Sequence, residues 1–97
     1  MNKNYLFGYK AERRAKLSLQ IAGYYVMTSR KSGGIFDLIA VKADEVLLIQ
    51  IKSTHEKTPP AYKKDLEKME RIFVPEKCRK ELWVWISRKG WTTYSVK

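Results

Sequence analysis

The stretch GGIFDLIAVKADEVLLIQIKS, residues 33–53, contains the pattern that decides the fold. Two nearly continuous apolar runs, residues 35–41 and 45–52, are separated by residues 42–44, which predicts two strands joined by a tight hairpin. Because the runs show little alternation of apolar and polar residues, we expect both faces of these strands to be covered, as in the middle of an α/β sheet.

Three polar residues of this stretch occupy positions expected to be dry: Asp37, Gln50 and Lys52. A carboxylate in an apolar strand costs several kcal/mol unless it is paired, hydrogen-bonded or bound to a metal. Gln50 and Lys52 are two positions apart, so their side chains point to the same face, about 7 Å from each other along the strand. Pairing across the hairpin brings Asp37 beside them.

This grouping has a structural and a chemical interpretation. In the structural one, Asp37 and Lys52 form a salt bridge at the end of the sheet and Gln50 forms a hydrogen bond nearby. In the chemical one, the group performs metal-assisted hydrolysis of a phosphodiester, because Mg²⁺ prefers carboxylates, waters and phosphate oxygens as ligands and a neighbouring lysine can steady the attacking water.

The chain before this stretch is predicted to form a helix, a strand and a loop. Residues 4–22 carry apolar side chains at spacings of three and four, which is typical of an amphipathic helix, and Gly23 is placed to end it. The apolar set is Phe7, Ala11, Ala15, Leu19 and Ala22. Residues 24–28 read as a short strand, and the SRKSGG segment that follows reads as a flexible basic loop.

The chain after the stretch is predicted to form a second helix and a second hairpin. Thr58 as N-cap and a first-turn proline indicate a helix over about residues 59–72. Its apolar side is formed by Tyr62, Leu66, Met69 and Phe73. LWVWIS and WTTYSVK flank RKG as two strands with Gly90 at the turn. The order α-β-β-β-α-β-β predicts an α/β fold with a mixed β-sheet and flanking helices.

Length and composition limit the function classes. A chain of 97 residues corresponds to one domain, residues 1–97. Its 20 lysines and arginines against 10 acids give a net charge of +10, which favours a polyanionic partner. One cysteine and one histidine exclude the usual zinc sites, so any metal is expected to have oxygen ligands. No apolar run predicts a membrane span or a signal peptide, and we expect a cytoplasmic, intracellular protein.

A glutamate on a helix, then an aspartate, then an acid-x-lysine on the next strand is the pattern of the PD-(D/E)xK, or restriction endonuclease-like, nuclease superfamily. This chain resembles it, with Gln50 in the place of the acid. The closest likeness is to the archaeal Holliday junction resolvases, and it covers nearly the whole chain. It runs through GYKAERR, AGYYV, the Ser/Gly-rich loop, FDLIAV, LLIQIKS and LWVWISRKGWTTYSV. The resemblance implies a restriction endonuclease-like core and an archaeal or viral origin.

The resemblance also implies roles for single residues. Asp37 matches the central metal ligand, Gln50 stands in the place of the second acid, and the carbonyl of Ile51 matches a further ligand. Lys52 matches the catalytic lysine, and Glu12 the helix-borne glutamate. The implied cofactor is Mg²⁺, with Mn²⁺ as the alternative. Because Gln50 offers a carbonyl oxygen without a charge, we expect weaker binding of the metal than in the family pattern.

Other residues are implied to contact the substrate. Arg13 resembles an arginine beside the site, and Ser32 a loop serine near the scissile phosphate. A solvated helix face is the alternative interpretation of Glu12 and Arg13. The residues expected to bind nucleic acid are Arg13, Arg14, Arg30, Lys31, Ser32 and Lys57.

Three functions are compatible with these observations. The first is a Mg²⁺-dependent DNA endonuclease that acts as a homodimer on branched or four-way-junction DNA. The second is a nuclease fold that binds DNA or RNA without cleaving it, because of Gln50. The third is a repair or restriction-type nuclease acting on linear or flap DNA.

Overall fold

The computed structural model describes residues 3–29, 34–56, 58 and 60–97, with side chains described from residue 8 onward. The predicted order α-β-β-β-α-β-β is confirmed. The elements are α1 (Lys3–Ile21), β1 (Tyr25–Thr28), β2 (Leu38–Lys42), β3 (Glu45–Thr54), α2 (Lys63–Glu70), β4 (Cys78–Ile86) and β5 (Gly90–Val96).

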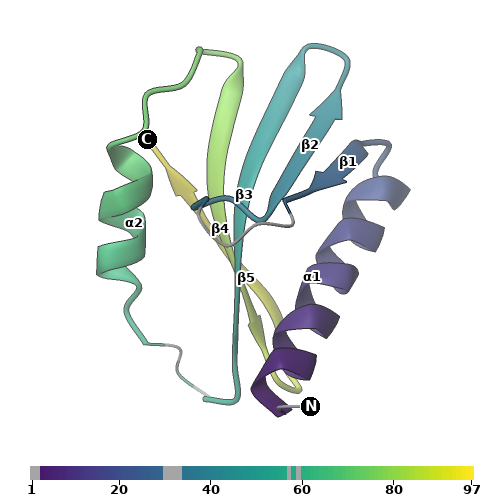
Figure 1. The fold of residues 1–97 in the computed structure, drawn as a ribbon, viewed down its shortest axis with the longest axis vertical. Coiled ribbons are helices and arrows are strands. Elements are labelled where there is room, and N and C mark those ends of the chain that lie inside the picture. The colour runs from purple at the N-terminus through teal and green to yellow at the C-terminus, as the bar shows by residue number, and fades with distance from the viewer. Residues whose placement is uncertain (1–2, 30–33, 57, 59) are drawn as a thin grey trace.

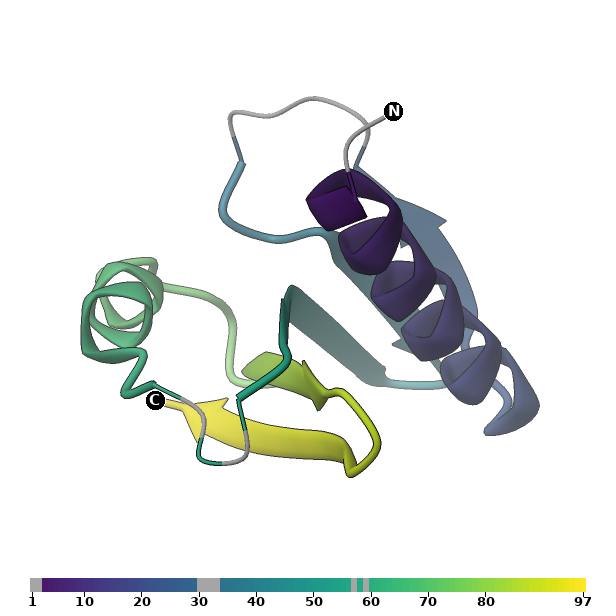
Figure 2. The same cartoon turned by 90° about the horizontal axis from the view of Figure 1, so that it is seen from below.

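The five strands form one mixed sheet in the order β1-β2-β3-β4-β5. All neighbours are antiparallel except β3 and β4, which are parallel and are connected through α2. A parallel pair needs such a crossover connection, whereas the antiparallel pairs are joined by short turns or loops. The two helices cover opposite faces of the sheet, α1 over the β1–β3 half and α2 over the β4–β5 half (Figures 1 and 2).

Each helix covers its own hydrophobic core. The α1 core consists of Ala15, Leu19, Val26, Leu38, Ala40, Leu47 and Ile49. The α2 core consists of Met69, Leu82, Val84 and Ile86, with partly buried apolar residues around it. The expectation that both faces of the central strands are covered is met on one face only. The α1 face of β2 and β3 is buried, whereas the side chains on their other face are half-buried, because α2 lies over β4 and β5. None of the helices in the described part of the chain is long and apolar enough to span a membrane.

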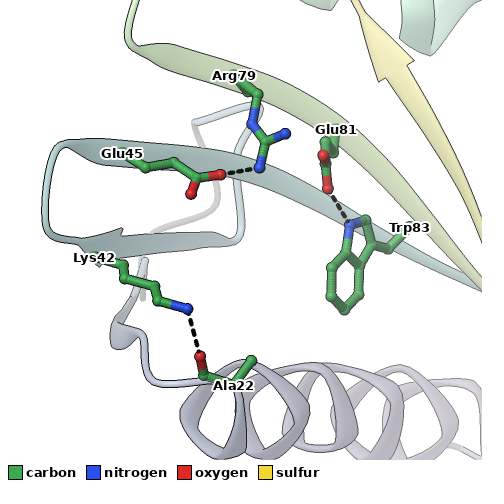
Figure 3. A network of polar contacts seen from close by, with 6 residues as sticks. All are labelled: Ala22, Lys42, Glu45, Arg79, Glu81 and Trp83. Carbon is green, nitrogen blue, oxygen red and sulfur yellow. Dashed lines mark hydrogen bonds and ion pairs between the residues drawn. The ribbon is translucent and has the colours of Figure 1, made fainter.

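The end of α1 is fixed by a glycine and a lysine. Gly23 has a φ of +96°, and the amides of Gly23 and Tyr24 donate to the carbonyls of Gln20 and Leu19 at 3.0 Å each, which is a Schellman motif. Lys42 donates from its ammonium to the carbonyl of Ala22 at 2.9 Å (Figure 3). This contact joins the end of the helix to the hairpin between β2 and β3.

Further polar and aromatic contacts join the strands. Glu45 pairs with Arg79 where β3 and β4 begin, and the Trp83 indole donates to Glu81 at 2.9 Å (Figure 3). Trp91 on β5 packs edge-to-face against Trp83 at 5.4 Å and against Trp85 at 5.1 Å. The tryptophans thus stabilise the β4–β5 side of the sheet.

The start of β2 differs from the sequence prediction. The strand begins at Leu38 and not at residue 35. Ile35 and Phe36 are neighbours in sequence, yet both pack against the α2 core. A regular strand would point them to opposite faces, so the chain must bend before the ladder starts. Asp37 therefore lies directly before the first residue of β2 and not inside a strand.

The second helix is shorter than predicted. It spans Lys63–Glu70 with Tyr62 as N-cap and without a side-chain cap bond, so the prediction of Thr58 as N-cap is wrong. Phe73 lies beyond the helix and is 97% exposed, so its predicted place on the apolar side is also wrong. The carbonyls of Met69 and Ile72, at and just beyond the end of the helix, accept hydrogen bonds from Lys80 on β4.

Candidate active site

A hollow of about 490 Å³ opens where the start of β2, the second half of β3 and α2 meet. Its lining residues are Gly34, Ile35, Asp37, Gln50, Lys52, Asp65 and Lys68. The three polar residues singled out in the sequence therefore share one hollow, and α2 adds an acid and a lysine to it.

The strand register explains this grouping. Gln50 pairs with Leu82 and Lys52 with Val84, and both partners lie in the α2 core. Residues paired across neighbouring strands point to the same face, so Gln50 and Lys52 face α2. The amide of Asp37 donates to the carbonyl of Ile49 at 2.8 Å, which places Asp37 beside the next residue, Gln50.

Asp37 is half-buried and has a backbone partner. The amide of Ile51, the residue whose carbonyl was predicted as a metal ligand, donates to Asp37 Oδ2 at 2.7 Å. Burial raises the pKa of the Asp37 carboxyl above its usual value, while the Ile51 amide and the positive charge of Lys52 act in the opposite direction. The Ile51 amide and Lys52 thus do not fully offset the cost of burying the negative charge of Asp37, and a cation bound to the carboxylate would stabilise that charge.

The salt bridge between Asp37 and Lys52, which the structural interpretation of the sequence expected, is not formed. Lys52 pairs instead with Asp65 of α2, at 3.6 Å between Nζ and Oδ1. The sequence analysis missed Asp65 and Lys68. A signal for Asp65 was present, because it stands three residues after Tyr62 and four before Met69, on the sheet-facing stripe of the helix.

Gln50 contains the clearest sign that the hollow takes a ligand. Its Oε1 atom is buried, and in the described part of the chain it has no hydrogen-bond partner. Buried polar atoms are nearly always paired, so an unpaired acceptor beside a carboxylate calls for an explanation. A divalent cation that prefers oxygen ligands fits this pair of groups.

The donor set differs from a cluster of acids. Among the residues the structure describes, no three His, Cys, Asp or Glu side chains are grouped closely enough to hold a metal. A cation at Asp37 and Gln50 would therefore have one carboxylate and one amide oxygen from this hollow, and its further ligands would come from the backbone, from water or substrate, or from an acid of another element.

Glu12 lies on the other side of Asp37, in the layer formed by α1. It lines a second hollow of about 790 Å³ together with Tyr9, Arg13, Lys16, Leu17, Gln20, Thr28 and Ser29. Burial and, second, the negative charge of Asp37 raise the pKa of Glu12, whereas Lys16 lowers it. The amide of Ser29 donates to the carbonyl of Asp37 at 2.9 Å, so the backbone of Asp37 adjoins this hollow.

The predicted nucleic-acid contacts fall into three groups. Arg13 is exposed and lines the second hollow with Glu12. Arg14 lies over the ring of Trp85, 4.5 Å from its centroid, in cation–π geometry. The remaining predicted residues, Arg30, Lys31, Ser32 and Lys57, lie outside the described residues.

Comparisons with known proteins show the family and the fold of the chain. The sequence profile of the family described as "Archaeal holliday junction resolvase (hjc)" matches residues 3–94. Among solved structures, the chain is similar to the 1.6 Å structure of Hjc, a Holliday junction resolvase from Archaeoglobus fulgidus, with a TM-score of 0.65 and 20% sequence identity. The alignment covers 91% of this chain and 76% of that one, and at this identity it shows a common fold. A search of curated proteins gives no match.

Proposed function

The chain belongs to the archaeal Holliday junction resolvase family, and from this premise we propose that it is a metal-dependent, structure-selective endonuclease that hydrolyses phosphodiester bonds in branched DNA. The observation that carries the proposal is the buried, unpaired Oε1 of Gln50. It lies in one hollow with the half-buried carboxylate of Asp37 and the ammonium of Lys52.

The proposed cofactor is Mg²⁺ or Mn²⁺. Asp37 and Gln50 would hold it, with the carbonyl of Ile51 and the carboxylate of Glu12 as further ligands. When bound, such an ion stabilises negative charge on a phosphate and lowers the pKa of a bound water. Lys52, held at 3.6 Å from Asp65, presents its ammonium to the same hollow, where it would orient the attacking water or stabilise the charge that develops on the phosphate.

The proposed substrate contacts are electrostatic. Arg13 and Lys16 line the hollow next to Glu12, and Lys68 lines the hollow of Asp37, so cations lie on both sides of the proposed reacting phosphate. Contacts of this kind read the phosphate backbone and not the bases, which fits selection by DNA shape. A homodimer of the domain, with two such sites, is the form proposed to act on a branched substrate.

A second candidate function is binding of nucleic acid without cleavage. It is favoured by the neutral amide at Gln50 and by the lack of a three-acid cluster in the described residues. Cleavage of linear or flap DNA by the same site is a third candidate.

A cleavage panel distinguishes these functions. Labelled four-way, flap, nicked and linear DNAs of equal length are incubated with the chain and Mg²⁺ or Mn²⁺. Faster cleavage of the four-way junction than of linear duplex is the expected result. Equal rates on both would contradict the resolvase function, and metal binding without cleavage of any DNA would favour the binding protein.

Lys52→Ala is the control for the chemistry in that panel. Because Lys52 is proposed to act on the reacting water or phosphate, its loss is expected to lower the cleavage rate by a factor of about 10²–10⁴. The affinity for junction DNA should stay nearly unchanged. Cleavage at the wild-type rate by this variant would show that another residue activates the water.

A further inference from the structure

The hollow around Asp37 contains a carboxylate that the family pattern does not supply, that of Asp65. It enters from α2, the helix on the far side of the hollow from β3, and its side chain is 26% exposed. Its partner is Lys52, 37% exposed, at 3.6 Å. The pair therefore connects the residue expected to act in catalysis to the opposite wall of the same hollow.

The formal charges of the hollow show what this contact changes. Asp37, Gln50 and Lys52 sum to zero, whereas the same three positions with an acid at position 50, as in the family's pattern, sum to −1. Adding Asp65 brings the sum in this chain back to −1. Lys68 also lines the hollow, but it is exposed, so water screens its charge more strongly.

Physical chemistry connects that charge to cation binding. A divalent ion at Asp37 and Gln50 would lie near the Lys52 ammonium and be repelled by it. A carboxylate paired with the ammonium offsets this repulsion and keeps the lysine turned toward the wall of the hollow. The effect does not require Asp65 to touch the metal.

We propose that Asp65 is a positioning residue that neutralises Lys52 and restores to the site the negative charge that Gln50 lacks, so that the site retains affinity for a divalent cation. The inference rests on the proposed metal-dependent function. It assigns to α2 a role beyond covering the sheet.

The test is a calorimetric titration of the metal-free chain with Mn²⁺, without DNA. Asp65→Asn is expected to weaken Mn²⁺ binding about tenfold, the order of effect of removing one partly screened charge near a dication. Asp65→Glu should retain most of the affinity, because it keeps the charge. The double variant Gln50→Glu with Asp65→Asn should recover the affinity, since it returns the lost charge to the neighbouring strand.

Glu67→Gln is the matched control, because Glu67 is an exposed acid of the same helix. It is expected to change Mn²⁺ affinity less than twofold. Thermal unfolding of each metal-free variant checks that the fold is intact, and Asp65→Ser replaces Asp65→Asn if the amide prevents folding.

The outcomes separate the inference from the proposed function. Unchanged affinity in Asp65→Asn, or equal losses in Asp65→Asn and Glu67→Gln, would overturn the role of Asp65 while leaving the nuclease intact. Mn²⁺ binding that depends on Asp65, without cleavage of any DNA, would support the role of Asp65 and contradict the proposed nuclease activity. No Mn²⁺ binding by the wild-type chain would overturn both.

Discussion

Gln50 sets the chemistry of the hollow at the scale of single residues. An acid at this position would add a second full negative charge beside Asp37, whereas the amide offers only the partial charge of Oε1. That atom is buried and unpaired in the described part of the chain, so it is free to bind a cation at little cost. Compared with an acid at this position, Gln50 thus lowers the expected affinity for metal but still supplies an oxygen ligand.

Gln50→Glu is therefore expected to tighten Mn²⁺ binding by about tenfold, because a carboxylate replaces a neutral ligand next to Asp37. Isothermal titration calorimetry measures the change. Ser18→Glu is the control, since it adds the same charge at an exposed position of α1 that lines neither hollow. If metal affinity and cleavage rate are both unchanged in Gln50→Glu, Gln50 is not a ligand.

Asp37 makes the stability of the metal-free chain depend on pH. Burial, the largest cause, raises its pKa above the ordinary 3.8, so the folded chain binds this proton more tightly than the unfolded chain. Stability in the wild type therefore falls as pH rises from the unfolded pKa through the folded one, and it stays lower at neutral pH.

Asp37→Asn cannot ionise, and its amide oxygen can still accept from Ile51. We expect it to raise Tm at pH 7 by a few degrees, with the gain shrinking as the pH falls through the raised pKa of the folded carboxyl and vanishing near the ordinary 3.8, below which the wild-type carboxyl is neutral in both states. Scanning calorimetry across pH measures this. Mn²⁺ should raise the Tm of the wild type and not that of the variant. A variant less stable than the wild type at pH 7 would contradict the argument.

Some site residues were predictable from the sequence and others were not. Gln50 and Lys52 stand out because a strand with period two points both to one face. The structural interpretation of the sequence paired Lys52 with Asp37 and not with Asp65, since a pattern along one hairpin does not show which helix will cover it. Asp65 was overlooked because a charged residue on a basic, amphipathic helix looks like part of its solvated side.

At the scale of elements, α2 is held in place by a buried lysine. Lys80 on β4 is 4% exposed, and its ammonium donates to the carbonyls of Met69 and Ile72 at 2.8 Å each and of Lys97 at 2.9 Å. All three donors of the ammonium are thus used. A cation at a helix C-terminus also interacts favourably with the helix dipole. Lys80 joins the end of α2, the sheet and the end of the last strand.

Lys80→Met is expected to lower the free energy of unfolding by about 2–4 kcal/mol, because it keeps the apolar stem but leaves partly buried carbonyls without a donor. Denaturant unfolding measures the loss. The control is Lys77→Met, whose exposed ammonium lies 4.0 Å from exposed Asp44 and should change stability by less than about 0.5 kcal/mol. Equal losses in the two variants would mean that Lys80 does not hold α2.

Elements were easier to predict than their ends. The hairpin between β2 and β3 follows from two apolar runs around a two-residue turn, where Ala43 has a φ of +44°. The contact of Lys80 with the end of α2 does not follow from the sequence of the helix, because Lys80 belongs to β4. Yet Lys80 is in phase with Leu82 and Val84 along β4, so its burial could have been inferred from the strand period.

At the scale of the whole molecule, charge is distributed unevenly around the proposed site. The net charge is +10, and the exposed or half-exposed cations Arg13, Lys16 and Lys68 line the two hollows that flank Asp37. Lys77, in contrast, lies at the opposite end of β2 and β3, beside the turn at Asp44. DNA bound across the two hollows would contact the first group and not the second.

Binding to four-way junction DNA is therefore expected to weaken steeply with salt, because each phosphate contact releases counterions. If about five phosphates are neutralised, the slope of log K against log salt is about −4.5. Arg13→Gln should make the slope shallower by about one unit and weaken binding similarly for junctions of different sequence, whereas Lys77→Gln should leave the slope unchanged. Fluorescence anisotropy in Ca²⁺, at five salt concentrations, measures these slopes without cleavage. Equal changes in both variants would mean that DNA is attracted by net charge alone, and the two hollows would then not be the binding surface.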